Sequence, residues 1–312
     1  MNISNQSPKT ATFFWSWLLV GLLALPLASS FVGSVRAVEP AVEATAAEPA
    51  EPERPLRFGA VGYLKAKTRD SVEPLVNYLS LKLGRDIHLV MYPSYNDVLV
   101  ALAEPSIDLG LLSPVVFLQA KGALDIKPIA NTFYPSGNFT YKAVILSRKD
   151  DPSVKTLADL VGKLVGFVDL FSASGYVVPK LMIEQAGVGA KNVNDKLFGN
   201  HTDAIAALES GEVSAAATYD LVFRHLGDTT RSIADYHVLA ESDPIPSDAV
   251  VASSRVDDAL VKRIQDELLR FYAYSADLPE YDGYIYPGFI PPDPSLYTSL
   301  RAIHDKVMGP IE

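Results

Sequence analysis

The sequence predicts an α/β protein whose sheets are mostly parallel. After residue 55, short apolar runs alternate with longer segments in which apolar residues recur every three or four positions, and such alternation of strands and helices is typical of α/β folds. The chain has 312 residues, of which 48% are hydrophobic, so it can form one large or two medium domains. No internal repeat is evident, and repeat architectures are therefore not indicated.

The first half of this part contains five predicted strands and three predicted helices. The strands are 56–62, 87–91, 107–112, 126–133 and 141–148, and the helices are 70–83, 95–103 and 114–121. Gly84 is a C-cap candidate for the first of these helices.

The second half repeats the alternation. The strands are 164–169, 213–218, 238–241 and 249–252, and the helices are 157–160, 174–186, 202–210, 256–274 and 295–307. A Pro/Tyr-rich segment, 281–294, precedes the last helix, and we expect it to pack as a strap on the first part of the fold. Ligands of such sheets bind at the carboxyl ends of strands, so the loops after residues 62, 91, 112, 168 and 218 are the candidate binding loops.

The first 37 residues are predicted to be an export signal. Lys9 is the only charged residue before an apolar stretch at about 13–28, and Val35-Arg36-Ala37 resembles a small-x-small cleavage site. The alternative is an uncleaved membrane anchor, but Pro26 and the two serines that follow at 29–30 shorten the apolar core below the roughly 20 residues of a comfortable span. A cleaved signal would place the protein in the periplasm.

Residues 38–55 consist mainly of Ala, Glu and Pro. Such a stretch buries too little apolar surface to offset its chain entropy, so we expect a disordered tether. Removal of residues 1–37 would take away Lys9 and Arg36 and no acidic residue, which changes the net charge from −10 to −12.

The overall composition excludes several classes of site. The chain has no cysteine, so disulfides, thiolate metal sites, a cysteine nucleophile and a lipidated cysteine are excluded. The net charge is −10 and no Lys/Arg run occurs, which argues against nucleic acid as a partner. His225, His237 and His304 have no partner at helical spacing, so neither a metal site nor a cofactor is expected.

The most informative segment is the loop at 166–179. A predicted strand ends at Asp169, a turn of small residues, Ser172-Ala173-Ser174-Gly175, follows, and an apolar helix continues. Ser172 is a good N-cap, and small side chains leave backbone N–H groups uncovered, so the turn can seat an anion. The alternative is an ordinary capped helix. Pro179 predicts that the regular helix begins only after an irregular first turn.

Several motifs around this loop occur together in one known family. They are Phe167-Val168-Asp169, Ser172 to Tyr176 with Pro179, Gly199-Asn200-His201 followed by Ala204 and Ala207, Gly211-Glu212-Val213-Ser214, and Ile245-Pro246-Ser247-Asp248. With these motifs the chain resembles the phosphate, phosphite and phosphonate-binding proteins of ABC importers over roughly residues 56–275.

The resemblance implies a periplasmic-binding-protein (Venus-flytrap) fold of the type II-like kind. Lobe 1 would comprise 56–145 plus 246–312 and lobe 2 would comprise 146–245, with two crossover hinge strands between them. The ligand would be held between the lobes.

The resemblance also implies a set of ligand-binding residues. Ser172, Ala173 and Ser174 would hold the oxyanion through backbone and hydroxyl donors, and His201 would donate to it from the start of a helix. Tyr95 and Tyr141 would reach it from the other lobe or the hinge.

Asp248 would face the ligand's substituent or a protonated oxygen, and Tyr176, Asp220 and Leu221 are weaker candidates. A His201 that is charged near neutrality would make affinity weaken as the pH rises.

The chain departs from the family pattern at three places. Ala173 replaces the middle threonine, Leu221 stands where aminophosphonate binders carry an acid, with Asp220 beside it, and Val213-Ser214 replaces Val-Asp. These changes disfavour amino-substituted phosphonates as ligands.

The expected function is that of a monomeric extracytoplasmic protein that delivers a small oxyanion to an ABC permease. The alternatives are a ligand sensor docked on a membrane receptor or kinase, and a binder of another small anion such as a sulfonate or carboxylate. An enzyme is not expected: Asp169, Ser172 and His201 could imitate a triad, but the sequence lacks a G-x-S-x-G elbow, a P-loop and an HExxH motif.

Overall fold

The computed structural model describes residues 54–134, 138–189, 192–275 and 288–311. These all belong to one compact unit, residues 51–312. The predicted export signal, nearly all of the predicted tether and the first part of the predicted strap lie outside the described residues. Within the described ranges, no helix combines the length and apolar character that crossing a membrane requires.

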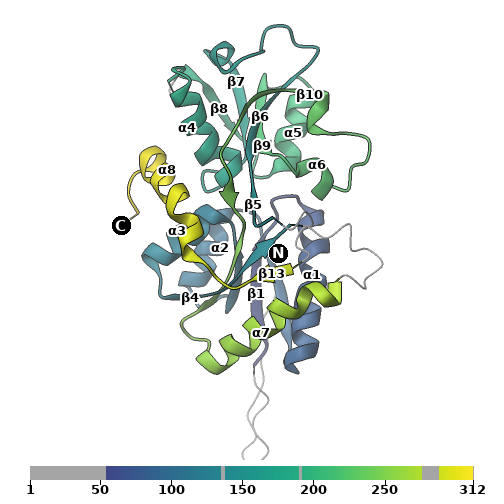
Figure 1. Ribbon diagram of the computed structural model, residues 1–312, viewed down its shortest axis with the longest axis vertical. Helices are drawn as coiled ribbons and strands as arrows, with labels where there is room; N and C mark the ends of the chain where they lie inside the picture. Colours follow the sequence, from purple (N-terminus) through teal and green to yellow (C-terminus); the bar gives the residue numbers. More distant parts are fainter. Residues whose placement is uncertain (1–53, 135–137, 190–191, 276–287, 312) are drawn as a thin grey trace, which may run out of the picture. The chain divides into compact units, whose positions relative to one another are not determined.

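The strands form two main sheets and one short pair (Figure 1). The six-stranded sheet has the order β13-β4-β12-β3-β1-β2, the five-stranded sheet has the order β10-β6-β9-β7-β8, and β11 pairs with β5. The strands are β1 (Leu56–Val61), β2 (Ile87–Tyr92), β3 (Leu109–Leu112), β4 (Ile126–Phe133), β5 (Thr140–Tyr141), β6 (Ala143–Arg148), β7 (Leu164–Phe167), β8 (Asn194–Leu197), β9 (Ala215–Tyr219), β10 (Tyr236–Glu241), β11 (Ile245–Pro246), β12 (Ala249–Ser253) and β13 (Gly288–Ile290).

Helices pack on both sheets. In Figure 1, α7 lies along the six-stranded sheet, and α4 and α5 lie beside the five-stranded one. The α-helices are α1 (Ala66–Leu83), α2 (Tyr95–Ala103), α3 (Pro114–Ala123), α4 (Val178–Gln185), α5 (His201–Glu209), α6 (Val222–His225), α7 (Asp258–Ser275) and α8 (Thr298–Met308). The shorter helical segments are η1 (Leu157–Leu160), η2 (Ala173–Val177), η4 (Ile233–Asp235) and η6 (Pro294–Tyr297).

Both sheets are mixed, which corrects the expectation of mostly parallel strands. β1 runs parallel to β2 and β3, whereas β12 runs antiparallel to β3 and β4. In the other sheet, β7 runs parallel to β8 and β9, and β6 runs antiparallel to β9. The reason is the path of the chain: β6 and β12 each follow a crossing between the sheets, so they enter at the carboxyl ends of the parallel strands.

The two segments in which the chain crosses between the sheets bring loops of both sheets together. The chain passes from the six-stranded to the five-stranded sheet through β5 and returns through β11, and these two strands pair antiparallel, Ile245 opposite Tyr141. The loops after β1, β3 and β4 and those after β7, β8 and β9 therefore face the same region, as carboxyl ends of parallel strands do.

The predicted irregular start of the helix after residue 172 is confirmed. Residues Ala173–Val177 form a π-helical turn, and the regular helix α4 starts at Val178 with Pro179 in its first turn. Proline has no backbone N–H to donate, and a first-turn position needs none. The wide turn therefore absorbs the proline without a break in the helix.

Candidate functional site

A cavity lies where loops from both sheets meet. About 30 Å³ of it is open to the centre of a water-sized sphere, compared with roughly 10–15 Å³ for one water molecule. From the five-stranded side it is lined by Ser172, Ala173, Ser174, His201, Tyr219 and His225. From the six-stranded side and the crossing it is lined by Val61, Tyr63, Tyr95, Ser113, Tyr134, Tyr141 and Asp248.

The serine loop after β7 is held by its own hydrogen bonds. The Ser172 hydroxyl accepts from the Gly175 N–H at 3.0 Å, and the Asp169 carboxylate accepts from the Phe171 N–H at 2.9 Å. A Cβ atom at Gly175 would stand 2.5 Å from the Cβ of Val168, so only glycine fits there. These contacts fix the loop in one shape.

The loop presents backbone donors to the cavity. Ala173 and Ser174 lie in the first turn of the helical segment, where N–H groups have no acceptor four residues earlier. Both residues are buried and line the cavity. Amide groups at a helix start attract an anion, and they do so without a charged side chain.

His201 begins α5 at the cavity wall. Asn200 caps the helix by accepting from the Asp203 N–H at 2.9 Å, and the His201 N–H donates to the Tyr63 carbonyl at 2.9 Å, which ties the start of α5 to the loop after β1. The ring Nδ1 is 3.0 Å from the Thr218 hydroxyl. This contact holds the ring so that its other nitrogen can serve a ligand.

His201 is neutral at physiological pH. Burial, assisted by the nearby His225, lowers the pKa of His201 to about 3. The idea that a charged His201 makes affinity weaken as the pH rises is therefore corrected: the ring acts as a neutral hydrogen-bonding group because desolvation opposes its charged form.

The tyrosines supply hydroxyl groups that keep their protons. Burial raises the pKa of Tyr95 and of Tyr141, and Asp248 raises both further. Ser172 opposes the rise at Tyr95 and Ser174 opposes the rise at Tyr141, because each serine side chain interacts with the tyrosine hydroxyl. These two tyrosines thus each meet one serine of the loop.

The cavity lining combines one carboxylate with many neutral donors. Asp248, immediately before β12, is the carboxylate, and it is partly exposed. No lysine or arginine is among the described residues that line the cavity. An anion held here would be bound by amide, hydroxyl and imidazole groups, and each such bond is stronger in a site shielded from water.

Seven predicted ligand residues line this cavity together: Tyr95, Tyr141, Ser172, Ala173, Ser174, His201 and Asp248. Three weaker candidates lie elsewhere. Asp220 accepts from the Lys142 N–H at 3.1 Å, Leu221 precedes α6 and packs on the core, and the Tyr176 hydroxyl lies 3.4 Å from Asp195.

Five polar lining residues were not predicted from the sequence: Tyr63, Ser113, Tyr134, Tyr219 and His225. Ser113 and Tyr63 follow β3 and β1, where the strand-end rule indicated the loops but not the side chains. Tyr134, Tyr219 and His225 stand in no motif, and only the packing of the two sheets brings them together.

Asp169, Ser172 and His201 do not form a catalytic relay. The Ser172 hydroxyl accepts from the Gly175 N–H, Asp169 accepts from a backbone amide, and the Nδ1 of His201 faces Thr218. A relay would need the histidine between serine and carboxylate. Among the described residues, no group of three or more His, Asp or Glu side chains is placed to hold a metal ion.

Comparisons with known proteins agree with this geometry. Residues 61–297 match the family described as ABC transporter, phosphonate, periplasmic substrate-binding protein. The phosphate-import protein PhnD of Mycolicibacterium smegmatis is 25% identical over 252 residues, which cover 74% of each chain.

Two solved structures share the fold. A binding protein component of an ABC phosphonate transporter from Pseudomonas aeruginosa superposes with a TM-score of 0.71 at 18% identity, over 80% of this chain and 85% of that one. PhnD1 from Prochlorococcus marinus, in complex with methylphosphonate, gives a TM-score of 0.71 at 17% identity, over 82% and 98%. The fold is thus the two-lobed periplasmic-binding-protein fold, and the chain belongs to the family of periplasmic substrate-binding proteins of phosphonate ABC transporters.

Proposed function

We propose that the protein captures a small phosphorus oxyanion, of the phosphonate, phosphite or phosphate kind, and delivers it to an ABC importer. The observation that carries this proposal is the serine loop, whose residues line a small cavity that has no lysine or arginine among its described lining residues. The M. smegmatis relative is a phosphate-import protein and the P. marinus structure holds methylphosphonate, which supports ligands of this chemistry.

The oxyanion would sit on the loop of Ser172, Ala173 and Ser174. Their amides meet its negative charge, as at other helix starts, and the hydroxyls of Tyr95 and Tyr141 and the His201 ring add donors. The carboxylate of Asp248 can only accept, so it favours a ligand oxygen that carries a proton.

Binding would be coupled to closure of two lobes, 56–145 plus 246–312 and 146–245, about the β5 and β11 crossing. A ligand that contacts both lobes stabilises the closed state by its differential affinity for that state. The closed monomer would dock on the membrane permease. We further propose that residues 1–37 are a cleaved signal, with retention as an anchor as the alternative.

The test is calorimetric titration of the full-length protein with phosphite, methylphosphonate, aminoethylphosphonate, phosphate and sulfate. We expect binding to at least one phosphorus oxyanion and no binding of aminoethylphosphonate, since Leu221 supplies no acid. Ser174→Ala should weaken binding about tenfold, because a neutral hydrogen bond contributes about 0.5–1.5 kcal/mol and 1.4 kcal/mol is a factor of ten.

The matched control is Ser254→Ala, an exposed serine that does not line the cavity. Its affinities should equal those of the unmodified protein. Heat from none of the four phosphorus compounds would refute the proposed ligand class.

A further inference from the structure

His225 lines the cavity but is not among the ligand-binding residues that the sequence predicted. It is the last residue of α6, and only 4% of it is exposed. Its Nδ1 lies 3.1 Å from the Tyr219 hydroxyl. Its Nε2 is fully buried and has no hydrogen-bond partner among the described residues.

Such a buried atom without a partner is unusual. Most buried side-chain polar atoms are hydrogen-bonded, because an unsatisfied one carries the whole cost of its desolvation. Tyr219 and His225 both line the cavity, and Tyr219 occupies one ring nitrogen. The other nitrogen has no partner among the described residues.

The neutral ring of His225 carries its one N–H on either Nδ1 or Nε2. Burial lowers the pKa of His225 to about 3, with a smaller contribution from Arg224, so the ring is neutral. The Tyr219 hydroxyl can donate to Nδ1 or accept from it. We assign the tautomer in which Tyr219 donates to Nδ1, which places the ring proton on Nε2.

The ring is also held from the opposite side of the cavity. Tyr134, which follows β4 in the six-stranded sheet, stacks on His225 with ring centroids 5.5 Å apart and planes 26° apart. Tyr219 packs against the same ring at 5.4 Å. A ring fixed between two tyrosines can direct its N–H at one ligand position only.

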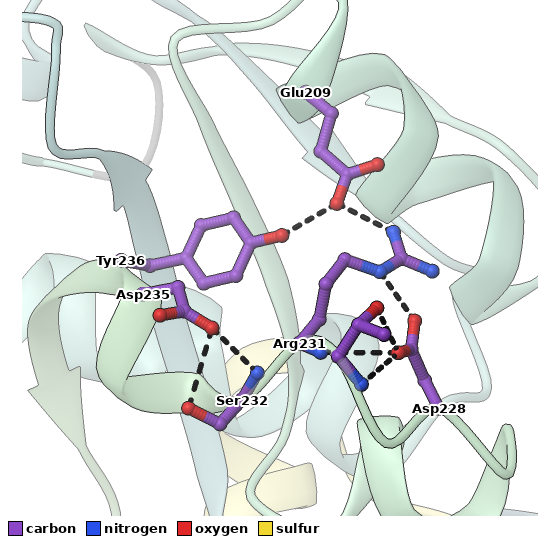
Figure 2. Close-up of polar contacts among 7 residues, drawn as sticks. Glu209, Asp228, Arg231, Ser232, Asp235 and Tyr236 are labelled. Carbon is purple, nitrogen blue, oxygen red and sulfur yellow. Dashed lines mark hydrogen bonds and ion pairs between the residues drawn. The ribbon is translucent and has the colours of Figure 1, made fainter.

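A network behind α6 fixes the helix that carries His225. Arg231 donates to Asp228 at 2.5 Å and to Glu209 of α5 at 2.6 Å, and the Tyr236 hydroxyl donates to the same Glu209 oxygen at 2.5 Å (Figure 2). The ring of Phe223, in α6, stacks on Tyr236 with centroids 5.5 Å apart. These contacts join α6 to α5 and β10, so His225 has a fixed place.

We propose that His225 is a specificity-determining residue that donates a hydrogen bond from Nε2 to an oxygen on the fourth substituent position of the bound phosphorus oxyanion. This rests on the proposed function and narrows its ligand class. Phosphate has an oxygen at that position, whereas phosphite has a hydrogen and methylphosphonate has a methyl group, neither of which accepts a hydrogen bond. The protein is therefore selective for phosphate over those two ligands.

His225 lies close in the chain to the position where aminophosphonate binders of the family carry an acid. The acid expected of aminophosphonate binders falls on Leu221, which does not line the cavity. His225 lies one helical turn further along the chain and does line it. A neutral N–H donor there repels an ammonium substituent and suits an oxygen.

The experiment is titration of the full-length protein and of His225→Phe with phosphate, phosphite and methylphosphonate. We expect the unmodified protein to bind phosphate most tightly, and His225→Phe to reduce its preference for phosphate over methylphosphonate about tenfold, the loss of one neutral hydrogen bond. His88→Phe, on the exposed face of β2, is the matched control and should keep every affinity.

Three results would overturn the inference. One is a protein that binds methylphosphonate or phosphite as tightly as phosphate, which leaves the proposed function intact. Another is an equal loss of affinity for all three ligands in His225→Phe, which would show that His225 has a structural role alone. Failure to bind any of the three would refute the proposed function as well.

Because the Phe variant can fail to fold, the imidazole nitrogens of the unmodified protein provide a second test. With ¹⁵N-labelled histidine, we expect the His225 Nε2 to carry the proton and its resonance to shift with phosphate but not with methylphosphonate. An Nε2 that carries no proton would contradict the assignment.

Discussion

The two sides of the cavity use different chemistry. The five-stranded side offers the amides and hydroxyls of one continuous loop, Ser172 to Ser174, together with two neutral imidazoles. The six-stranded side and the crossing offer tyrosine hydroxyls and one carboxylate, from positions as far apart in the chain as Tyr63 and Asp248. One side therefore depends on the local backbone, and the other depends on long side chains that only the fold assembles.

This difference explains why a departure from the family pattern at residue 173 is tolerable. Ala173 has lost the hydroxyl of the family's threonine but keeps its N–H in the first turn of the segment. In the proposed site, the anion would require the backbone of the loop rather than the identity of its side chains. Changes that alter the backbone should accordingly have larger effects than changes of single side chains.

The largest effect is expected from Gly175→Ala. The new Cβ would meet the Val168 side chain at 2.5 Å and the Ser172 hydroxyl at 2.7 Å, so the loop must move. Displacement of two donors, at about a factor of ten each, should weaken oxyanion binding on the order of a hundredfold. Calorimetry of the folded variant measures this loss.

Gly187→Ala is the control for general destabilisation. Gly187 has φ 79°, and no atom of the described residues lies within 4 Å of an added Cβ, so alanine there costs about 1 kcal/mol of stability through backbone strain without reaching the cavity. Its affinity should be unchanged. An unchanged affinity in Gly175→Ala instead would mean that the loop amides do not hold the ligand.

The next effect concerns the two neutral histidines of the five-stranded side. The unfolded chain takes up protons on histidine as the pH falls through about 6.5, whereas His201 and His225 stay neutral in the folded protein until about pH 3. The contribution of each histidine to the free energy of unfolding is therefore fully present above pH 7. It falls as the pH falls, by about 2 kcal/mol per histidine between pH 7 and 5. Urea unfolding at the two pH values measures it.

The quantity to compare between variants is the change in the free energy of unfolding with pH, not the free energy at one pH. Burial raises the pKa of Asp169 and of Asp220, and these carboxyls act in the opposite direction because the folded protein binds their protons first. His225→Phe should lose about 2 kcal/mol of the pH dependence that the unmodified protein shows. An unchanged pH dependence in His225→Phe would show that His225 titrates normally.

The smallest effect is expected where the two sides meet at the surface. Lys65, in the loop after β1, pairs with Asp203 of α5, and the two side chains are 53% and 40% exposed. Exposed pairs contribute at most about 1 kcal/mol, so Lys65→Ala should weaken binding by no more than roughly fivefold. High salt should abolish the difference.

Lys196→Ala is the matched comparison. Lys196 pairs with Glu212 within the five-stranded side at similar exposure, 43% and 45%. Because this pair does not link the two sides, its loss should leave ligand affinity unchanged. Equal effects of the two variants would show that Lys65 does not favour closure.

Features that depend on local sequence could be predicted, whereas features that depend on tertiary packing could not. The helix at 95–103 and the strand at 126–133 were predicted with the bounds that the structure has, since apolar periodicity and flanking turns define them. β8 was missed because Asn194–Leu197 is exposed throughout and has no apolar alternation. The mixed pairing was also missed, because periodicity does not report strand direction.

For the site, local motifs indicated the residues of the serine loop and the start of α5. Tyr134 and His225 carried no such signal: their roles arise from a stacking contact between residues 91 positions apart in the chain. Likewise, the neutral state of His201 depends on burial by elements from both sheets. Desolvation is a property of the assembled protein, and no spacing of residues encodes it.

The cavity lining contains no lysine or arginine among the described residues, and this has a kinetic consequence. The whole chain carries a net charge of −10, so an approaching anion is repelled until it reaches the short-range donors of the loop. Added salt screens this repulsion, with a Debye length of about 10 Å at 0.1 M, and leaves the buried hydrogen bonds in place. We therefore expect the association rate to rise with ionic strength, the reverse of electrostatically steered capture.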